Sequence, residues 1–201
     1  MIETVLSMRN QNDTLSFMRN RLLISFFMLL LVAAPSRGLT AGVLNGGIII
    51  LEDQKYFDTL LVKINEAEKN ILVNMYVFKT SPKRSNPANM IRDALIRAAK
   101  KGVDVKVLLE REVKKKDSLN EDNEYTASRL VKGGVKVFFD SPLQRTHVKA
   151  IVIDNRFTFI GSHNLTASAL KYNRELSLLI DSREVAGETT AYIEEMIKKA
   201  R

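Results

Sequence analysis

A chain of 201 residues is long enough for one domain of ordinary size and a short additional segment. Hydrophobic residues make up 45% and charged residues 27%, which excludes an intrinsically disordered chain. With no cysteine and two histidines, disulfide frameworks, thiol nucleophiles and cysteine-ligated metals are excluded, and a multi-histidine metal site is not expected. The net charge of +8 suits a polyanionic partner such as nucleic acid or anionic lipid, and equally a basic protein that binds neither.

Residues 1–40 are expected to form a separate N-terminal segment, because 22–34 is an uncharged apolar run that follows Arg19 and Arg21. The run is shorter than the roughly 20 residues of a membrane span and fits the core of a signal peptide. A start at Met18 would place it directly behind a short basic stretch. We therefore expect either a cleaved signal, giving a periplasmic or extracellular protein, or an uncleaved membrane anchor, and we favour the first.

The remaining residues, 41–201, are expected to form one α/β domain. In chain order the hydrophobic patterns and turn residues predict a strand at 47–51, a helix at 54–69, a strand at 71–78, a helix at 88–101, a strand at 103–109, a polar loop at 111–122, a helix at 123–132, strands at 135–139, 147–153 and 156–160, a helix at about 164–171, a strand at 174–180 and a helix at 183–199. This alternation predicts a mixed β-sheet flanked by helices, an α/β/α sandwich.

The informative motif lies at 147–164 and has the spacing H-x-K-x4-D-x6-G-S-x-N, with its specified positions at His147, Lys149, Asp154, Gly161, Ser162 and Asn164. Residues two apart in a strand share a face, so the histidine and lysine are expected to point the same way. The Asp-Asn turn returns the chain beside them. We expect the glycine to let the backbone approach a ligand, and the serine and asparagine to begin a helix whose N–H groups attract phosphate. The motif therefore predicts an anion-binding spot that uses no metal.

The motif resembles the HKD motif of the phospholipase D superfamily, present once as in its small bacterial endonucleases and its mitochondrial-type members. The likeness extends over about 45–200 and includes MYVF, AAKKGVDVKVLLE and KYNREL. The resemblance implies a phospholipase D-like domain over 41–201, a metal-independent phosphodiesterase without a cofactor. Because its chemistry needs a second histidine and the chain carries one motif, it also implies a homodimer with one composite site.

The resemblance implies particular roles for the site residues. His147 corresponds to the histidine that attacks phosphorus to form a phosphohistidine, and Lys149, Ser162 and Asn164 to the ligands of the non-bridging oxygens. Glu175 corresponds to the acidic residue that orients the histidine ring, with a solvated surface carboxylate as its alternative.

Other residues near the motif are expected to lie outside the chemistry. Asp154 and Gly161 are expected to have structural roles in the motif, with Asp154 organising its turn. His163 is expected to line the pocket or support the structure, with a role as the acid within one chain as its alternative. Tyr76 and Phe78 are expected to belong to the core. Basic loop residues, including the lysines at 114–116, either guide a polyanion or form ordinary solvated surface.

These observations leave three functions to compare. We favour an endonuclease that cleaves DNA or RNA, because the chain is basic and carries a single motif. A lipid phosphodiesterase acting on an anionic phospholipid such as cardiolipin is the alternative, and an anchor at 22–34 would favour it by holding the site at a membrane. An inactive nucleic-acid-binding module is the third possibility.

Overall fold

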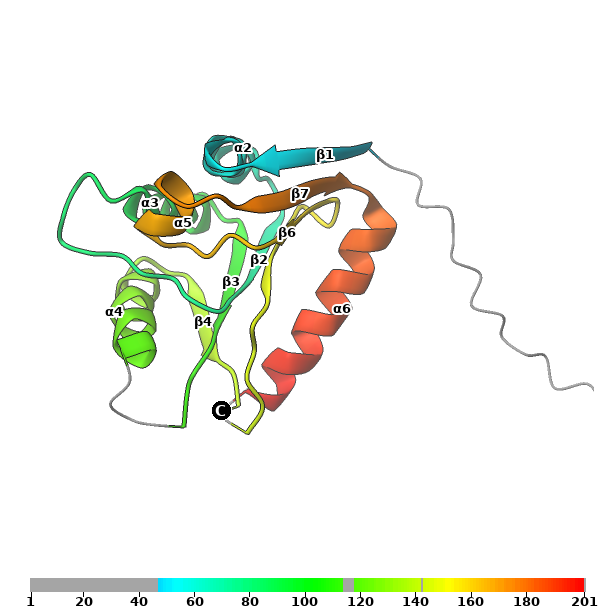
Figure 1. Ribbon diagram of the computed structural model, residues 1–201. Helices are drawn as coiled ribbons and strands as arrows, with labels where there is room; N and C mark the ends of the chain where they lie inside the picture. The colour runs from blue at the N-terminus through cyan, green and yellow to red at the C-terminus, as the bar shows by residue number, and fades with distance from the viewer. Residues whose placement is uncertain (1–46, 114–117, 142, 201) are drawn as a thin grey trace, which may run out of the picture. The chain divides into compact units, whose positions relative to one another are not determined.

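The computed structural model describes residues 47–113, 118–141 and 143–200 (Figure 1). The chain divides into two units, Met1–Val43 and Leu44–Arg201, and all described residues belong to the second. The expected signal or anchor at 22–34 and the lysines at 114–116 lie outside the described residues. Among the helices that are described, none has the length and apolar character needed to cross a bilayer.

The described residues form one mixed β-sheet with helices, as the sequence predicts. The elements are β1 (Gly47–Glu52), α2 (Gln54–Glu66), β2 (Asn70–Met75), α3 (Pro87–Lys100), β3 (Asp104–Leu109), α4 (Ser118–Lys132), β4 (Lys136–Phe139), β5 (Lys149–Ile153), β6 (Phe157–Gly161), α5 (Ala167–Lys171), β7 (Leu176–Asp181) and α6 (Arg183–Lys199). The strand order is β1-β7-β6-β5-β2-β3-β4. Strands β2, β3 and β4 run parallel, and every other neighbouring pair is antiparallel.

Helices cover the two faces of the sheet unequally. Helices α2, α3, α4 and α5 lie on one face, and α6 alone crosses the other (Figure 1). The larger core joins the first group of helices to the sheet through residues such as Leu60, Ile91 and Leu130. The smaller core holds α6 through Ala186 and Ile193, which pack against β2, β3 and β5. No residue of β1, β6 or β7 belongs to this smaller core. On the side of the sheet where α6 lies, these three strands are therefore not packed into it as β2, β3 and β5 are.

Two helices begin later or earlier than the sequence patterns predict. Helix α5 begins at Ala167, because the N–H of Leu165 bonds to the carbonyl of Val77 and holds the chain extended until Thr166 caps the helix. Helix α4 begins at Ser118 instead of 123, because polar residues of its first turns are buried: Asn123 is fully enclosed and hydrogen-bonded on the sheet side. A pattern search for apolar residues reads such a polar turn as a loop.

Candidate active site

The motif residues gather at one end of the central strands because of the directions in which these strands run. His147 and Lys149 lie at the start of β5, and Ser162 follows the end of β6. Glu175 precedes β7, and Tyr76 follows β2. Strand β5 is antiparallel to both β2 and β6, and β6 is antiparallel to β7. The starts of β5 and β7 and the ends of β2 and β6 therefore lie at the same end of the sheet.

The centre of the site is a contact between the motif histidine and lysine. The Nζ atom of Lys149 lies 3.0 Å from Nδ1 of His147 and donates to the carbonyl oxygen of His147 at 2.8 Å. The lysine side chain is buried, whereas the histidine is exposed. The shared direction that the sequence predicts for these two side chains is therefore confirmed.

Tyr76 belongs to this centre, and the expectation that it is an ordinary core residue is wrong. Its ring centroid lies 4.5 Å from that of His147, and Nζ of Lys149 lies 5.0 Å above the same tyrosine ring. The predicted strand 71–78 ends at Met75, so Tyr76 follows the strand and reaches the site edge. Phe78, two residues further on, is fully buried in the core as predicted.

The electrostatic surroundings favour a neutral histidine. Partial burial, followed by the positive charges of Lys149 and Arg145, lowers the pKa of His147 below its ordinary value. Burial also lowers the pKa of Lys149, and the nearby carboxylate of Glu175 opposes that effect. An imidazole that is neutral near pH 7 is the form that attacks as a nucleophile.

The side chains of Ser162, Asn164 and Glu175 form hydrogen bonds with each other or with neighbouring residues of the protein. The hydroxyl of Ser162 donates to the carboxylate of Glu175 and accepts the N–H of Leu176 at 3.1 Å. Asn173 donates to the same carboxylate at 3.0 Å, and Oδ1 of Asn164 accepts the N–H of Val77 at 3.3 Å. Neither Ser162 nor Asn164 lies at a helix N-terminus, because α5 begins only at Ala167, so that expectation is wrong.

Asp154, the aspartate of the motif, lies at the opposite end of β5 from His147 and Lys149. The carboxylate of Asp154 accepts the N–H groups of Glu68, Lys69 and Asn70 at 3.1, 2.7 and 3.3 Å. Its own φ of 55° and that of Asn155, 52°, form the turn between β5 and β6. The structural role predicted for this aspartate is therefore confirmed.

Gly161 is required by a neighbouring strand. A Cβ atom at this position would lie 2.3 Å from Oγ and 2.4 Å from Cα of Ser177 in β7. This agrees with the structural role expected for the motif glycine, and the close approach that the structure shows is between two strands of the sheet. Its effect on the site is indirect, through the position of Ser162.

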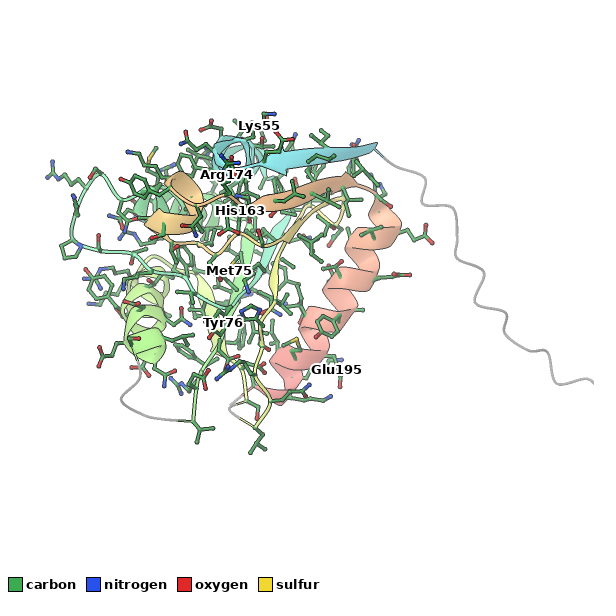
Figure 2. All side chains as sticks on the ribbon, viewed as in Figure 1. Lys55, Met75, Tyr76, His163, Arg174 and Glu195 are labelled. Atoms are coloured by element: carbon green, nitrogen blue, oxygen red, sulfur yellow. The ribbon has the colours of Figure 1, made fainter. Side chains whose placement is uncertain are left out.

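The second histidine of the chain, His163, is buried between β7 and the start of α2. The ring of His163 stacks on Tyr56 with 4.2 Å between centroids, and its two nitrogens lie 2.7 Å from Oγ of Ser177 and 3.0 Å from the carbonyl oxygen of Asp53. Figure 2 shows His163 apart from Tyr76, which contacts His147 and Lys149. Both ring nitrogens are engaged, which supports the structural role expected for this residue.

A cleft of about 590 Å³ opens beside the exposed histidine. It lies between the segment that leads into β5 and the last turns of α6, and its lining includes Arg145, His147, Val148, Tyr192 and Met196. Asp140, Glu195 and Lys199 also line the cleft, so apolar, basic and acidic side chains all lie beside His147. Within the described parts of the chain, no three histidine, aspartate or glutamate side chains are grouped as metal ligands would be.

Comparison with known proteins places this geometry in a family. Residues 60–197 match the model of the family described as the cardiolipin synthase, PLD-like domain. The chain belongs to the phospholipase D superfamily. Cardiolipin synthase A from Citrobacter koseri is 30% identical over 129 residues, which cover 63% of this chain and 25% of that protein. The Salmonella arizonae enzyme is 31% identical over the same coverage, so the chain spans about a quarter of the length of these relatives.

Solved structures share the phospholipase D fold along most of the domain. Nuc from Salmonella typhimurium, a phospholipase D family member, matches with a TM-score of 0.65 and 23% identity over 78% of this chain and 97% of that one. NucT from Helicobacter pylori gives a TM-score of 0.60 and 20% identity over 77% and 96%. The match over nearly the whole of both solved chains shows that this chain has the phospholipase D-like fold.

Proposed function

We propose that the chain is a metal-independent endonuclease that cleaves DNA or RNA through a phosphohistidine at His147. The observation that carries this proposal is the exposed histidine in contact with the buried ammonium of Lys149. A phosphodiester placed there would meet a nucleophile and a fixed positive charge together. The net charge of +8 favours a polyanionic substrate, and the fold matches Nuc and NucT over nearly their whole chains.

The contact between lysine and histidine must change when the substrate binds. An ammonium group only donates hydrogen bonds, so Nδ1 of His147 accepts in the structure described here and the ring proton sits on Nε2. Attack by Nε2 requires that proton to move to Nδ1. We therefore assign to Lys149 a movement from the ring to a phosphate oxygen, and to Glu175 the role of pairing with the Nδ1–H that results.

The reaction then proceeds in two displacements. Nε2 of His147 attacks phosphorus, the bond to the leaving oxygen breaks, and a general acid protonates that oxygen. Water next attacks the phosphohistidine, the same group now accepts a proton from the water, and the phosphorus–nitrogen bond breaks. Lys149, Ser162 and Asn164 are assigned to the non-bridging oxygens, which carry the developing charge. The acid and base is assigned to His147 of a second copy.

An exposed apolar surface beside the site supports this dimer. Ile50, Leu178 and Ile160 are paired across β1, β7 and β6, so their side chains share one face. Their neighbours Leu179 and Phe159 belong to the core on the helix-covered side, which places the three on the α6 side. Ile50 is 56% exposed and Ile160 is 42% exposed. Exposed apolar patches of this kind mark interfaces, and we assign this one to the second copy.

The nuclease proposal is tested with the purified full chain. Plasmid DNA and single-stranded DNA are incubated in excess EDTA, with His147→Ala in parallel. Cleavage by the wild type alone supports the proposal, and activity that a chelator abolishes contradicts the mechanism. The matched family description and the cardiolipin synthase relatives favour an anionic phospholipid as the second candidate, so cardiolipin and phosphatidylglycerol vesicles form a second arm. Nucleic-acid binding with no cleavage in either arm would indicate an inactive binding module.

The dimer is tested separately by sedimentation. Ile160→Asp should convert the dimer to a monomer and abolish turnover, because it places a charge in the assigned interface. Val62 on α2, on the other face of the sheet, is 51% exposed, so Val62→Asp is the matched control and should change neither property. The N-terminal segment is proposed to export or anchor the enzyme, and N-terminal sequencing of the mature protein distinguishes the two.

A further inference from the structure

The nucleophile is carried by a connection that has no regular structure of its own. Between β4 and Lys149, where β5 begins, the described residues 140, 141 and 143–148 belong to no helix or strand. His147 lies at the end of this connection and is exposed, so its side chain is held on one side only, by Tyr76 and Lys149. Its geometry must therefore depend on how the residues just before it are held.

Thr146, the residue before the nucleophile, is held by two buried carboxylates. Its N–H donates to Oε2 of Glu110 at 2.5 Å, and its hydroxyl donates to the carboxylate of Asp140. Thr146 is 4% exposed, Glu110 1% and Asp140 9%. The same aspartate accepts the N–H of Ser141 at 2.7 Å. The N–H and the hydroxyl of Thr146 are thus both engaged by largely buried carboxylates, and Thr146 and Asp140 form part of the wall of the cleft.

Glu110 is itself anchored to the strand that leads to Tyr76. Its N–H donates to the carbonyl of Met75 at 3.4 Å. The side-chain amide of Asn123, fully buried on α4, donates to the carbonyl oxygens of Glu110 at 3.0 Å and Tyr76 at 2.9 Å. One framework therefore fixes both the tyrosine that contacts the His147 ring and the carboxylate that holds Thr146.

A buried carboxylate is an expensive way to hold one N–H group. Burial raises the pKa of Glu110, and the charges of Asp140 and Glu112 raise it further, while the Thr146 N–H and Arg145 oppose them. Burying such a group costs free energy that an apolar residue would not. The cost indicates that the two bonds to Thr146 serve a purpose beyond filling the core.

We propose that Glu110 and Asp140 are positioning residues for His147, which hold Thr146 by its N–H and hydroxyl and so direct the histidine ring toward Lys149 and the cleft. The inference rests on the proposed function in one respect, namely that His147 is the nucleophile. It adds two acidic residues that contact neither phosphate nor ring. Glu110→Gln keeps an acceptor of the same shape for the Thr146 N–H, whereas Glu110→Ala removes it.

The test measures kcat and KM of the full chain on bis(p-nitrophenyl) phosphate, a small diester that needs no extended binding surface. Glu110→Ala should lower kcat about 10- to 100-fold with little change in KM, the scale expected when a reacting group is misplaced by about 1 Å. Glu110→Gln should retain most of the wild-type kcat. Asp154→Ala is the matched control, because that carboxylate also holds backbone N–H groups but at the far end of β5; it should lower stability and leave the kcat of the folded protein unchanged.

Two outcomes would overturn the inference: an unchanged kcat in folded Glu110→Ala, or a loss in Glu110→Gln as deep as in Glu110→Ala. If Glu110→Ala does not fold, Thr146→Val removes only the hydroxyl and should still lower kcat several-fold; an unchanged kcat there would equally refute it. Hydrogen exchange of the Thr146 amide separates this inference from the proposed function. The exchange rate should rise in Glu110→Ala and not in Asp154→Ala, even if the wild type cleaves no diester. Equal exchange rates in the two variants would refute the proposed hold of Glu110 on Thr146.

Discussion

Replacing Gly161 by alanine should destabilise the sheet and disturb the site together. The added Cβ would lie 2.3 Å from Oγ of Ser177, 2.4 Å from its Cα and 2.6 Å from the carbonyl oxygen of Leu176, where ordinary contacts are 3.4–4 Å. Two of these three atoms are backbone, so β6 and β7 must separate by about 1 Å. Overpacking of this kind costs about 1–3 kcal/mol. For a domain of this size that is a fall in Tm of about 2–12 °C.

The same separation would move Ser162, one of the side chains that we assign to the phosphate. The N–H of Ser162 bonds to the carbonyl of Leu176 at 3.1 Å, and the N–H of Leu176 bonds to the Ser162 hydroxyl at 3.1 Å. Pushing the strands apart weakens this pair and shifts Ser162 relative to Lys149, so kcat of the protein that remains folded should also fall.

A matched control is available in the same sheet. Gly47 in β1 has nothing within 4 Å of an added Cβ, so Gly47→Ala should leave both properties unchanged. The assays are calorimetric unfolding and diester hydrolysis at a temperature well below either transition. A Gly161→Ala protein that unfolds within 1 °C of the wild type would show that the two strands can part freely, and the packing argument would be refuted.

Three further results are expected at the site. Lys149→Met should lower kcat about 10²- to 10³-fold, the scale for removing one group that stabilises transition-state charge; turnover near the wild-type value would refute its assignment to the phosphate. His147 must be neutral to attack and its pKa is lowered by burial and by Lys149 and Arg145, so the acid-side fall in kcat/KM should lie below pH 6.5, the ordinary histidine value. Arg145→Gln removes one of these charges and should move that fall to higher pH; a shift in the opposite direction would contradict the cause. His163→Ala should cost about 1–3 kcal/mol of stability by leaving buried partners unpaired, and an activity loss as deep as that of His147→Ala would show that the ring is catalytic instead.

The convergence of the site could be predicted from the sequence because its residues are close along the chain. An Asp-Asn turn joins two strands, so the residues before the first and after the second must lie at one edge, and the φ values of 55° and 52° at Asp154 and Asn155 form that turn. The alternation of strands and helices likewise predicts the mixed sheet. Both predictions depend on local patterns alone, and both agree with the structure.

Features that depend on distant contacts could not be predicted in this way. Tyr76 reaches the site only because β2 ends at Met75, and the apolar run shows no such boundary. The neighbour of Gly161 is a strand that begins fifteen residues later in the chain, so sequence alone suggested a ligand in its place. Glu110 directly follows the buried strand β3, and its hydrogen-bond partner Thr146 lies 36 residues further along the chain. Hydrogen bonds of this length leave no periodic signal.

The arrangement of the site in one continuous stretch has a consequence for engineering. The residues assigned to the site all lie within 147–175, next to the ends of the adjacent strands β5, β6 and β7, namely His147, Lys149, Ser162, Asn164 and Glu175. The segments that border the edge from elsewhere, such as 79–86 and 140–146, are separate in the chain. Loop exchange that keeps Asp140 and Thr146 in place can therefore alter which diester enters, while the reacting groups keep their relative geometry. A library that varies the bordering loops but retains Asp140 and Thr146 is therefore the natural way to redirect the proposed activity.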